Sequence, residues 1–346
     1  MDVLMRKMEV GRRLTHYRPN EEVSFGQLKV KFSYKREDLD ITIDKENLKF
    51  FTAGSTLPSY GLLLNSGQIG ITLCLHYLKN KLQVSEIVSH TPAYVGSVEA
   101  MNLYGIKMAA QGQDLWICSG SFSKENLKAI LSEKWRCVVI DSTCWALNEP
   151  VFKKLVDEIS CDILFQIRSI SKLDMGGEEY GSLGSLLIKG DEQLIELFRE
   201  YYRLFSAAPS LCDITPELFN ESKYQDNLNR VGNIVRNANQ IAQEVGSISL
   251  PLHSKYFFLP FAEGGKEENI ERQKLFLNLG RSYKLNIRSL RSFGFNFWNA
   301  EFFFNRVTNQ HVARICPSST TDIEEVEKFI FVLKLFLSKE KELVNI

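Results

Sequence analysis

The stretch RSISKLDMGGEEYGSLGSL, residues 168–186, decides how the rest of the chain is interpreted. It follows the apolar run CDILFQI (161–167), which predicts a buried strand. In an open α/β sheet, ligands bind at the carboxyl ends of the strands. The lone lysine of this stretch, Lys172, stands between small hydroxyl residues and a pair of glycines that let the backbone turn tightly. In dry or positively charged surroundings such a lysine loses its proton and can attack an aldehyde, whereas most loop lysines are only solvated.

The composition limits the classes of protein to which the chain can belong. Its 346 residues are 44% hydrophobic, which predicts one large domain with a smaller one beside it. The 42 Lys and Arg residues balance 42 Asp and Glu residues, so we expect neither a nucleic-acid partner nor a membrane partner. No apolar run approaches the ~20 residues that span a bilayer, and the N-terminal stretch does not have the pattern of a secretory signal. Seven scattered cysteines without a CxxC pair, and five isolated histidines, predict free, mostly buried thiols, no metal site and a cytoplasmic location.

The order of patterns along the chain predicts two domains of different class. After an N-terminal segment (1–60), short apolar runs alternate with helical periodicity, which predicts an α/β large domain over 61–215. This domain should have three layers, αβα, around a mostly parallel sheet. A connecting helix is expected over 216–246, and strands such as KYFFLPF and VARICPS predict a smaller α+β C-terminal domain over 247–346. We also predict that Ser123 caps a helix, that Pro150 lies in a first helical turn, and that Thr321 and Glu324 form a capping box.

Three further positions carry candidate chemistry. In NSGQIG (65–70), a Ser-Gly pair before a helix suits a phosphate, although an ordinary helix cap explains it as well. Asp141 ends the apolar strand in VVIDSTCW, where it could hold a protonated ring nitrogen or a metal, or cap the next turn. Arg314, in the middle of the apolar run VARICPS, suits a substrate carboxylate, with a structural Asp or Glu as the competing explanation.

Taken in order, these features resemble a known family. A phosphate turn, an aromatic residue after a strand (Tyr94 in HTPAYVGS), a strand-end acid, an S-x-S-K motif and a late arginine are similar to the pyridoxal-phosphate enzymes of the aspartate aminotransferase fold, fold type I. The resemblance runs from about residue 61 to the C-terminus. It implies that Lys172 forms the Schiff base with the cofactor, that Asp141 pairs with the pyridinium nitrogen, and that Tyr94 stacks on the ring and helps to pass protons. The other implied cofactor-binding residues are Ser66, Gly67, Gln68, Thr143, Ser169 and Ser171, and the implied substrate-binding residues are Arg314 and Ser292.

Two departures separate the chain from ordinary aminotransferases of this fold. Tyr180 stands where many of them carry an arginine eight positions after the lysine, and Cys144 stands where many carry a tyrosine three positions after the aspartate. The Cys/Met-metabolism branch, which includes cystathionine γ-synthase, resembles the chain better. Its patterns SGMAA, VDNTF, S-x-T-K-x-x-x-G and S-L-G are similar to SGQIG, IDSTC, SISKLDMGG and SFG here.

The resemblance therefore implies a divergent, cystathionine γ-synthase-like enzyme that performs β/γ-elimination or replacement on a small α-amino acid. An aminotransferase is one alternative, and a non-catalytic homologue that serves as a partner subunit is another. A homodimer is expected from the resemblance alone. That branch normally supplies a Tyr-x-Arg motif from the partner subunit, and YKR (34–36) has this form, so whether Tyr34 or Arg36 completes the site stays open, as does the substrate side chain.

Overall fold

The computed structural model describes residues 22–25, 28–31, 42–43, 47–52, 60–89, 94–119, 123–177, 182–209, 220–246, 255–261, 265–305 and 309–344. They form two compact units. The large unit contains the described residues up to 175 together with those from 182 to 226. The small unit contains Gly176, Gly177 and the described residues from 227 onward.

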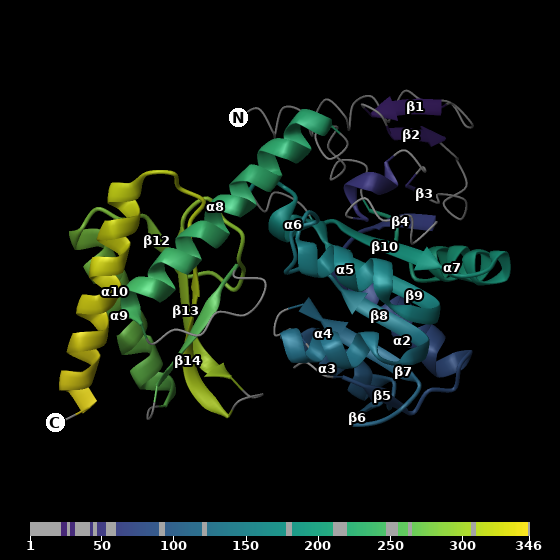
Figure 1. Cartoon of the computed structure of the whole chain (residues 1–346), viewed down its shortest axis with the longest axis horizontal. Coiled ribbons are helices and arrows are strands. Elements are labelled where there is room, and N and C mark those ends of the chain that lie inside the picture. The colour runs from purple at the N-terminus through teal and green to yellow at the C-terminus, as the bar shows by residue number, and fades with distance from the viewer. Residues whose placement is uncertain are drawn as a thin grey trace. The chain divides into compact units, whose positions relative to one another are not determined.

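An eight-stranded sheet forms the centre of the large unit (Figure 1). Its strands, in spatial order, are β3 (Thr42–Ile43), β4 (Tyr60–Leu64), β10 (Gly184–Lys189), β9 (Ser160–Ser169), β8 (Lys134–Asp141), β7 (Asp114–Cys118), β5 (Glu86–Val88) and β6 (Lys107–Ala109). Strands β5 to β9 are parallel, while β10 runs antiparallel to both β9 and β4, so β4 has the same direction as β9. Separately, β1 (Glu22–Phe25) and β2 (Leu28–Lys31) form an antiparallel pair, and η2 (Leu48–Phe50) is a short 3-10 helix.

The helices cover both faces of this sheet because the chain crosses it in both directions. Connections between parallel strands are right-handed, so the direction of each crossing decides the face on which its helix lies. Helices α2 (Gly67–Asn80) and α3 (Val95–Leu103) lead from β4 towards β6, whereas α4 (Lys124–Leu131) and α5 (Pro150–Glu158) lead from β7 back to β9. The two pairs therefore lie on opposite faces, and α7 (Glu192–Leu204) packs on α2. The predicted three-layer αβα architecture is confirmed.

Local sequence signals begin these helices. Ser123 forms a capping box with Asn126 at the start of α4, and Pro150 occupies the first turn of α5, as predicted. Asp191 caps α7, where its carboxylate accepts the N–H of Leu194 at 2.8 Å. Each cap satisfies one N–H group that has no carbonyl partner within the helix.

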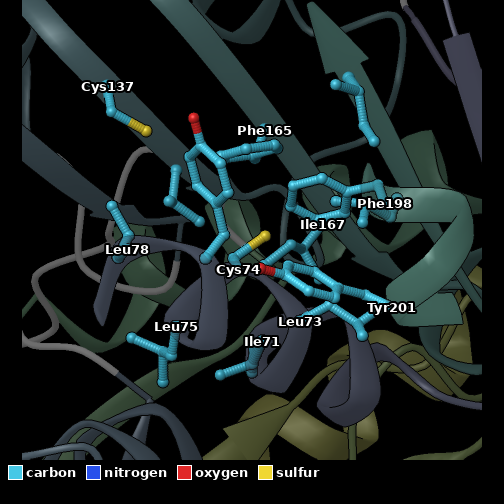
Figure 2. Close-up of a cluster of buried hydrophobic side chains, with 14 of the residues drawn as sticks. Ile71, Leu73, Cys74, Leu75, Leu78, Cys137, Phe165, Ile167, Phe198 and Tyr201 are labelled. Carbon is cyan, nitrogen blue, oxygen red and sulfur yellow. The ribbon is translucent and has the colours of Figure 1, made fainter. Parts of the chain in front are cut away.

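The main core of the large unit lies between α2 and the sheet (Figure 2). Leu73, Cys74 and Leu78 of α2 are fully buried there, together with Phe165 of β9 and Phe198 of α7. The predicted burial of the thiols is confirmed for the six cysteines that the structure describes, while Cys212 lies outside the described residues. This core fixes α2 against the strands whose ends form the candidate site.

The small unit has a four-stranded mixed sheet. Its order is β11 (Phe257–Phe261), β14 (Gln310–Cys316), β13 (Trp298–Asn305) and β12 (Ile287–Arg288), with only the β12–β13 pair parallel among these strands. Helices α9 (Lys266–Ser282) and α10 (Ile323–Val344) pack with it around a common apolar core. Helix α8 (Glu221–Val245) lies within the segment predicted to connect the domains. A mixed α and β C-terminal unit is thus confirmed.

One predicted helix cap is wrong. We expected Thr321 and Glu324 to form a capping box, but α10 begins at Ile323, and Asp322 Oδ1 accepts the N–H of Glu324 at 3.0 Å. The hydroxyl of Thr320 accepts the N–H of Asp322 at 3.2 Å, and the helix begins one residue later than a cap at Thr321 would place it. Asp322 therefore occupies the capping position.

Among the described residues, no helix is both long enough and apolar enough to span a bilayer.

Candidate functional site

Three parallel strands of the large sheet end at the same edge, and the predicted residues follow them. Ser66 comes after β4, Asp141 ends β8, and Ser169 ends β9. Strand β10 begins at this edge with Gly184, which pairs with both Leu64 and Ser169. Because carboxyl ends of parallel strands meet at one edge, segments that are far apart in the sequence converge here.

The first component of the edge is the N-terminus of α2. Ser66 Oγ accepts the N–H of Ile69 at 3.3 Å, so Ser66 is a helix cap. Among the described residues, no acceptor is recorded for the N–H groups of Gly67 and Gln68. A Cβ added to Gly184 would lie 2.6 Å from Gly67 N, so the start of β10 can approach this turn only as glycine. A helix N-terminus with open N–H groups is suited to an anion.

Two serine hydroxyls lie beside this helix end. A Cβ added to Gly67 would lie 3.1 Å from Ser169 Cβ, which places Ser169 against the first turn of α2. Ser169 Oγ is 3.1 Å from Ser171 Oγ. The structure thus brings four predicted phosphate residues together, since Ser66 and Gly67 lie at the helix start and Ser169 and Ser171 next to it.

The second component is the buried carboxylate of Asp141, which is 7% exposed. Thr143 donates its N–H to Asp141 Oδ1 at 3.1 Å, and Thr143 Oγ1 accepts the N–H of Ser169 at 3.1 Å. Burial raises the pKa of Asp141 above its ordinary value, against the smaller opposing effects of hydrogen bonds from Thr143 and the charge of Arg168. No salt bridge to Asp141 is recorded within the described residues. Such a carboxylate is suited to a cationic ligand group, because an unpaired buried charge is costly.

The third component is an exposed aromatic ring. Tyr94 precedes α3 and is 57% exposed. Gln68 Nε2 donates to Gly96 O at 3.3 Å, and a Cβ added to Gly96 would lie 2.5 Å from Tyr94 Cε1 and 2.7 Å from Gln68 Oε1. The ring of Tyr94 therefore lies over Gly96 and next to Gln68 at the start of α2. A planar ligand could stack on its exposed part.

Lys172 follows the carboxyl end of β9. It lies in α6 (Ile170–Leu173), a single helical turn that follows Ser169 directly, and it is partly buried. The two glycines after it, Gly176 and Gly177, both have positive φ angles, 64° and 85°, which confirms their expected role in turning the backbone.

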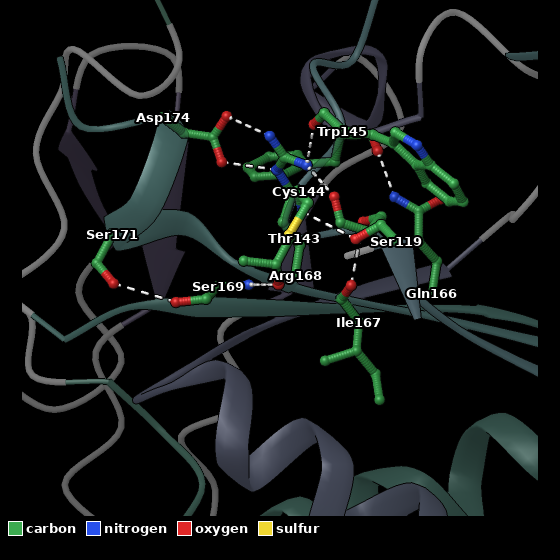
Figure 3. A network of polar contacts seen from close by, with 12 residues as sticks. Ser119, Thr143, Cys144, Trp145, Gln166, Ile167, Arg168, Ser169, Ser171 and Asp174 are labelled. Carbon is green, nitrogen blue, oxygen red and sulfur yellow. Dashed lines mark hydrogen bonds and ion pairs between the residues drawn. The ribbon is translucent and has the colours of Figure 1, made fainter. Parts of the chain in front are cut away.

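A polar network that the sequence patterns did not predict supports these residues (Figure 3). Arg168, which precedes Ser169, is 1% exposed and binds the carboxylate of Asp174 and two carbonyls of the turn after Asp141. Ser119, which directly follows the unpredicted strand β7, accepts the N–H of Cys144 with its hydroxyl at 2.9 Å. A charged residue at the end of an apolar run was the signal that could have identified Arg168.

The predicted substrate residues lie in the small unit, whereas Lys172 belongs to the large unit. Arg314 Nη2 binds Glu301 Oε2 at 2.8 Å, and the two residues are direct neighbours across β13 and β14. Glu301 is thus the structural acid that the competing explanation required. The carbonyl of Ser292 accepts Asn299 Nδ2 at 2.7 Å. Tyr34, Arg36 and Tyr180 lie outside the described residues.

Comparisons with known proteins extend this picture. No family model matches the sequence, and no curated protein matches it. A cystathionine gamma synthase from Xanthomonas oryzae pv. oryzae, solved in complex with aminoacrylate and cysteine, matches the structure with a TM-score of 0.64 at 15% identity over 98% of both chains. CalE6, a methionine gamma lyase from Micromonospora echinospora, matches with a TM-score of 0.61 at 15% identity over 95% of this chain and 98% of its own. The chain therefore has the fold of these enzymes, the fold type I architecture that the sequence resemblance implied.

Proposed function

We propose that this chain is a pyridoxal-phosphate-dependent enzyme that acts on a small α-amino acid through Lys172, by β/γ-elimination or replacement. The observation that carries the proposal is the meeting of a buried, unpaired carboxylate and an anion-binding helix end at one edge of the sheet. Asp141 suits a protonated ring nitrogen, and the start of α2 with its two serines suits a phosphate. Pyridoxal phosphate carries both groups on one ring. The likeness to a γ-lyase and a γ-synthase supports the elimination or replacement branch.

The residues present fit this cofactor. The N–H groups of Gly67 and Gln68 and the hydroxyls of Ser66, Ser169 and Ser171 would hold the phosphate. Asp141 would accept a hydrogen bond from the ring N–H, and the positive charge of the ring would then offset the cost of burying the carboxylate. Thr143, which bonds both Asp141 and Ser169, would orient that carboxylate. The exposed ring of Tyr94 would cover one face of the cofactor.

When bound, pyridoxal phosphate supplies an electron-accepting ring that stabilises negative charge at the substrate Cα. Lys172 Nζ would hold the cofactor through its aldehyde. The Lys172 amine would also act as the general base for the proton at the substrate Cα. Lys172 or Tyr94 would pass a proton to the departing side-chain group.

Arg314 remains the proposed partner of the substrate carboxylate, on the strength of its place in the sequence pattern. Its ion pair with Glu301 already neutralises part of its charge. Ser292 is proposed to contribute to the same substrate-binding region. A homodimer, expected from the resemblance, belongs to this proposal as well.

The proposal is tested by adding pyridoxal phosphate to the purified protein and reducing with borohydride. A yellow complex and a mass increase on the peptide that contains Lys172 are expected, and Lys154→Ala, a change at a half-exposed surface lysine, should leave both unchanged. Protein that stays colourless with added cofactor would contradict the proposal. A panel of amino acids then identifies the chemistry, because ammonia and a 2-oxo acid formed without an acceptor indicate a lyase. Strict dependence on an added 2-oxo acid indicates an aminotransferase.

A further inference from the structure

Arg168 joins the two turns that carry the proposed catalytic groups. Its guanidinium binds Asp174 through two hydrogen bonds, Nε to Oδ2 at 2.7 Å and Nη2 to Oδ1 at 2.8 Å. Its Nη1 donates to Ser142 O at 2.7 Å and to Trp145 O at 2.8 Å. A guanidinium has five N–H donors, so this network uses four of them. Figure 3 shows Arg168 between the Asp174 carboxylate and the Ser142–Trp145 turn.

The pair with Asp174 encloses the turn of Lys172. Arg168 lies four positions before Lys172, and Asp174 lies two positions after it. Between them, α6 is a single turn of four residues, too short to be stable as an isolated helix. The two parallel hydrogen bonds therefore close a short loop around Lys172 and restrict the directions that its side chain can take.

The two carbonyl contacts extend this restraint to Asp141. Ser142 follows Asp141 directly, and its N–H and hydroxyl both donate to Ile167 O, at 2.9 and 3.0 Å. Side chains alternate along β9, so Ser169 faces the start of α2 while Arg168 reaches the Ser142–Trp145 turn from the other face. Arg168 thus touches neither proposed ligand group but holds the backbone on which both sit.

The energetics favour a positioning role over a purely stabilising one. The Arg168 side chain is 1% exposed and that of Asp174 is 16% exposed, so the pair loses much of its hydration. A buried ion pair is on balance weak evidence for stability, because desolvation offsets the attraction. What a bidentate, hydrogen-bonded arginine adds is a defined geometry, which lysine cannot reproduce.

We propose that Arg168 and Asp174 are positioning residues that fix Lys172 relative to Asp141, so that one rigid ligand meets the amine and the carboxylate together. This inference rests on the proposed function, because the ligand in question is pyridoxal phosphate. Catalytic groups must be held close to their productive geometry, and a misplacement of about 1 Å can lower the reaction rate by on the order of 10²-fold.

The test compares two ion pairs of the same chemistry. The double variant Arg168→Met with Asp174→Leu removes both charges, so neither partner is left buried alone. The control double variant, Arg136→Met with Asp114→Leu, removes a second arginine–aspartate pair with two hydrogen bonds, which joins β8 to the first residue of β7. Arg168→Lys serves as a milder variant if the first double variant fails to fold.

Two measurements are made on each protein. Spectroscopic titration gives the dissociation constant for pyridoxal phosphate, and hydrogen exchange of the cofactor-free protein reports the amides of 142–145 and 169–174. At the Arg168 pair we expect affinity to fall by about 10–100-fold and both segments to exchange faster together. The control pair should leave the affinity within about threefold and these segments protected, because Arg136 contacts neither turn.

The outcomes separate this inference from the proposed function. If the wild type binds the cofactor and the Arg168 variants match the control in affinity and exchange, the positioning role is overturned and the proposed function stands. If the wild type takes up no pyridoxal phosphate, the proposed function is overturned and this inference falls with it.

Discussion

Asp141 in the large unit and Arg314 in the small unit are both charged residues on apolar strands, yet their surroundings differ. Asp141 ends β8, and no ion pair to it is recorded within the described residues, so burial raises its pKa. Arg314 lies in the middle of its antiparallel hairpin, directly opposite Glu301, and the two side chains are 17% and 16% exposed. Asp141 thus has no ion-pair partner among the described residues, whereas Arg314 pairs with an acid in the neighbouring strand.

The position of a charged residue along a strand affects whether it pairs within the sheet or can bind a ligand. In mid-strand, a cross-strand neighbour stands within reach of every side chain, so a buried charge can be satisfied inside the sheet. At the carboxyl end the strands give way to turns, and a charge there meets ligands as readily as protein groups. The experiments below test this contrast, beginning with the variant for which we expect the strongest loss.

The largest effect is expected at the strand-end site. Lys172→Ala should lower turnover of the amino-acid substrate by about 10³-fold or more, because it removes both the covalent attachment and the general base. Steady-state assays with saturating pyridoxal phosphate measure this change, and Lys154→Ala is the matched control. If turnover survived in Lys172→Ala, the central assignment would be wrong.

Asp141→Asn should separate function from stability. We expect cofactor-dependent turnover to fall by roughly 10²–10³-fold, because the amide cannot neutralise a protonated ring nitrogen. The cofactor-free protein should become more stable, by roughly 0.5–2 kcal/mol near neutral pH, because the variant no longer buries a charge. Chemical denaturation with and without pyridoxal phosphate measures both effects.

The pH dependence of that gain has a definite sign. The folded-state pKa of Asp141 lies above the unfolded value of about 3.8, so the wild type is favoured when the carboxyl is protonated. Its contribution is fully present below about pH 3.8 and is lost as the pH rises through the raised pKa. The advantage of Asp141→Asn should therefore grow over that window and vanish in acid. An advantage that did not change with pH would contradict an unpaired carboxylate.

At the cross-strand pair, a smaller loss is expected. Arg314→Met and Glu301→Gln should each destabilise the protein by about 1–3 kcal/mol. Glu301→Gln leaves the largely buried Arg314 without its acid, and Arg314→Met leaves Glu301 with only the longer contact to Arg291, Nε to Oε1 at 3.6 Å. The double variant should cost less than the sum of the two. Urea denaturation of the four proteins in a double-mutant cycle measures this coupling. In parallel, a rise in KM for Arg314→Met alone, with kcat unchanged, would support carboxylate binding, whereas an unchanged KM would leave only the structural role.

The smallest effect is expected at the helix cap. Ser66→Ala should cost about 1 kcal/mol, because the N–H of Ile69 loses its acceptor. Ser123→Ala, which removes the capping serine of α4, a helix that contributes none of the proposed ligand groups, is the matched control for stability. If the start of α2 binds a phosphate, only Ser66→Ala should also weaken the affinity for pyridoxal phosphate.

Much of the fold was legible in local patterns. Alternating apolar strands and capped helices predicted the three-layer unit, and Ser123 and Pro150 begin their helices as expected, because capping depends on a few neighbouring residues. The short strand β7 was missed, since its five residues DLWIC have no alternation, being buried on both faces. Thr321 was predicted to cap the last helix, but the capping residue is Asp322, one position later. The prediction did not include the hydrogen bond in which the Thr320 hydroxyl accepts the N–H of Asp322.

Local sequence patterns were enough to identify the chemical groups that the chain offers and the order in which the strand ends present them. Lys172, Asp141 and the Ser66–Gly67 turn were identified because strand-to-loop transitions are local and can be read from periodicity. Only the tertiary structure decided which groups meet. Glu301 stands opposite Arg314 through strand register, and Arg168 binds Asp174 and the Ser142–Trp145 turn through packing of segments that are distant in the chain. Such contacts depend on how strands pair, and no short stretch of sequence contains that information.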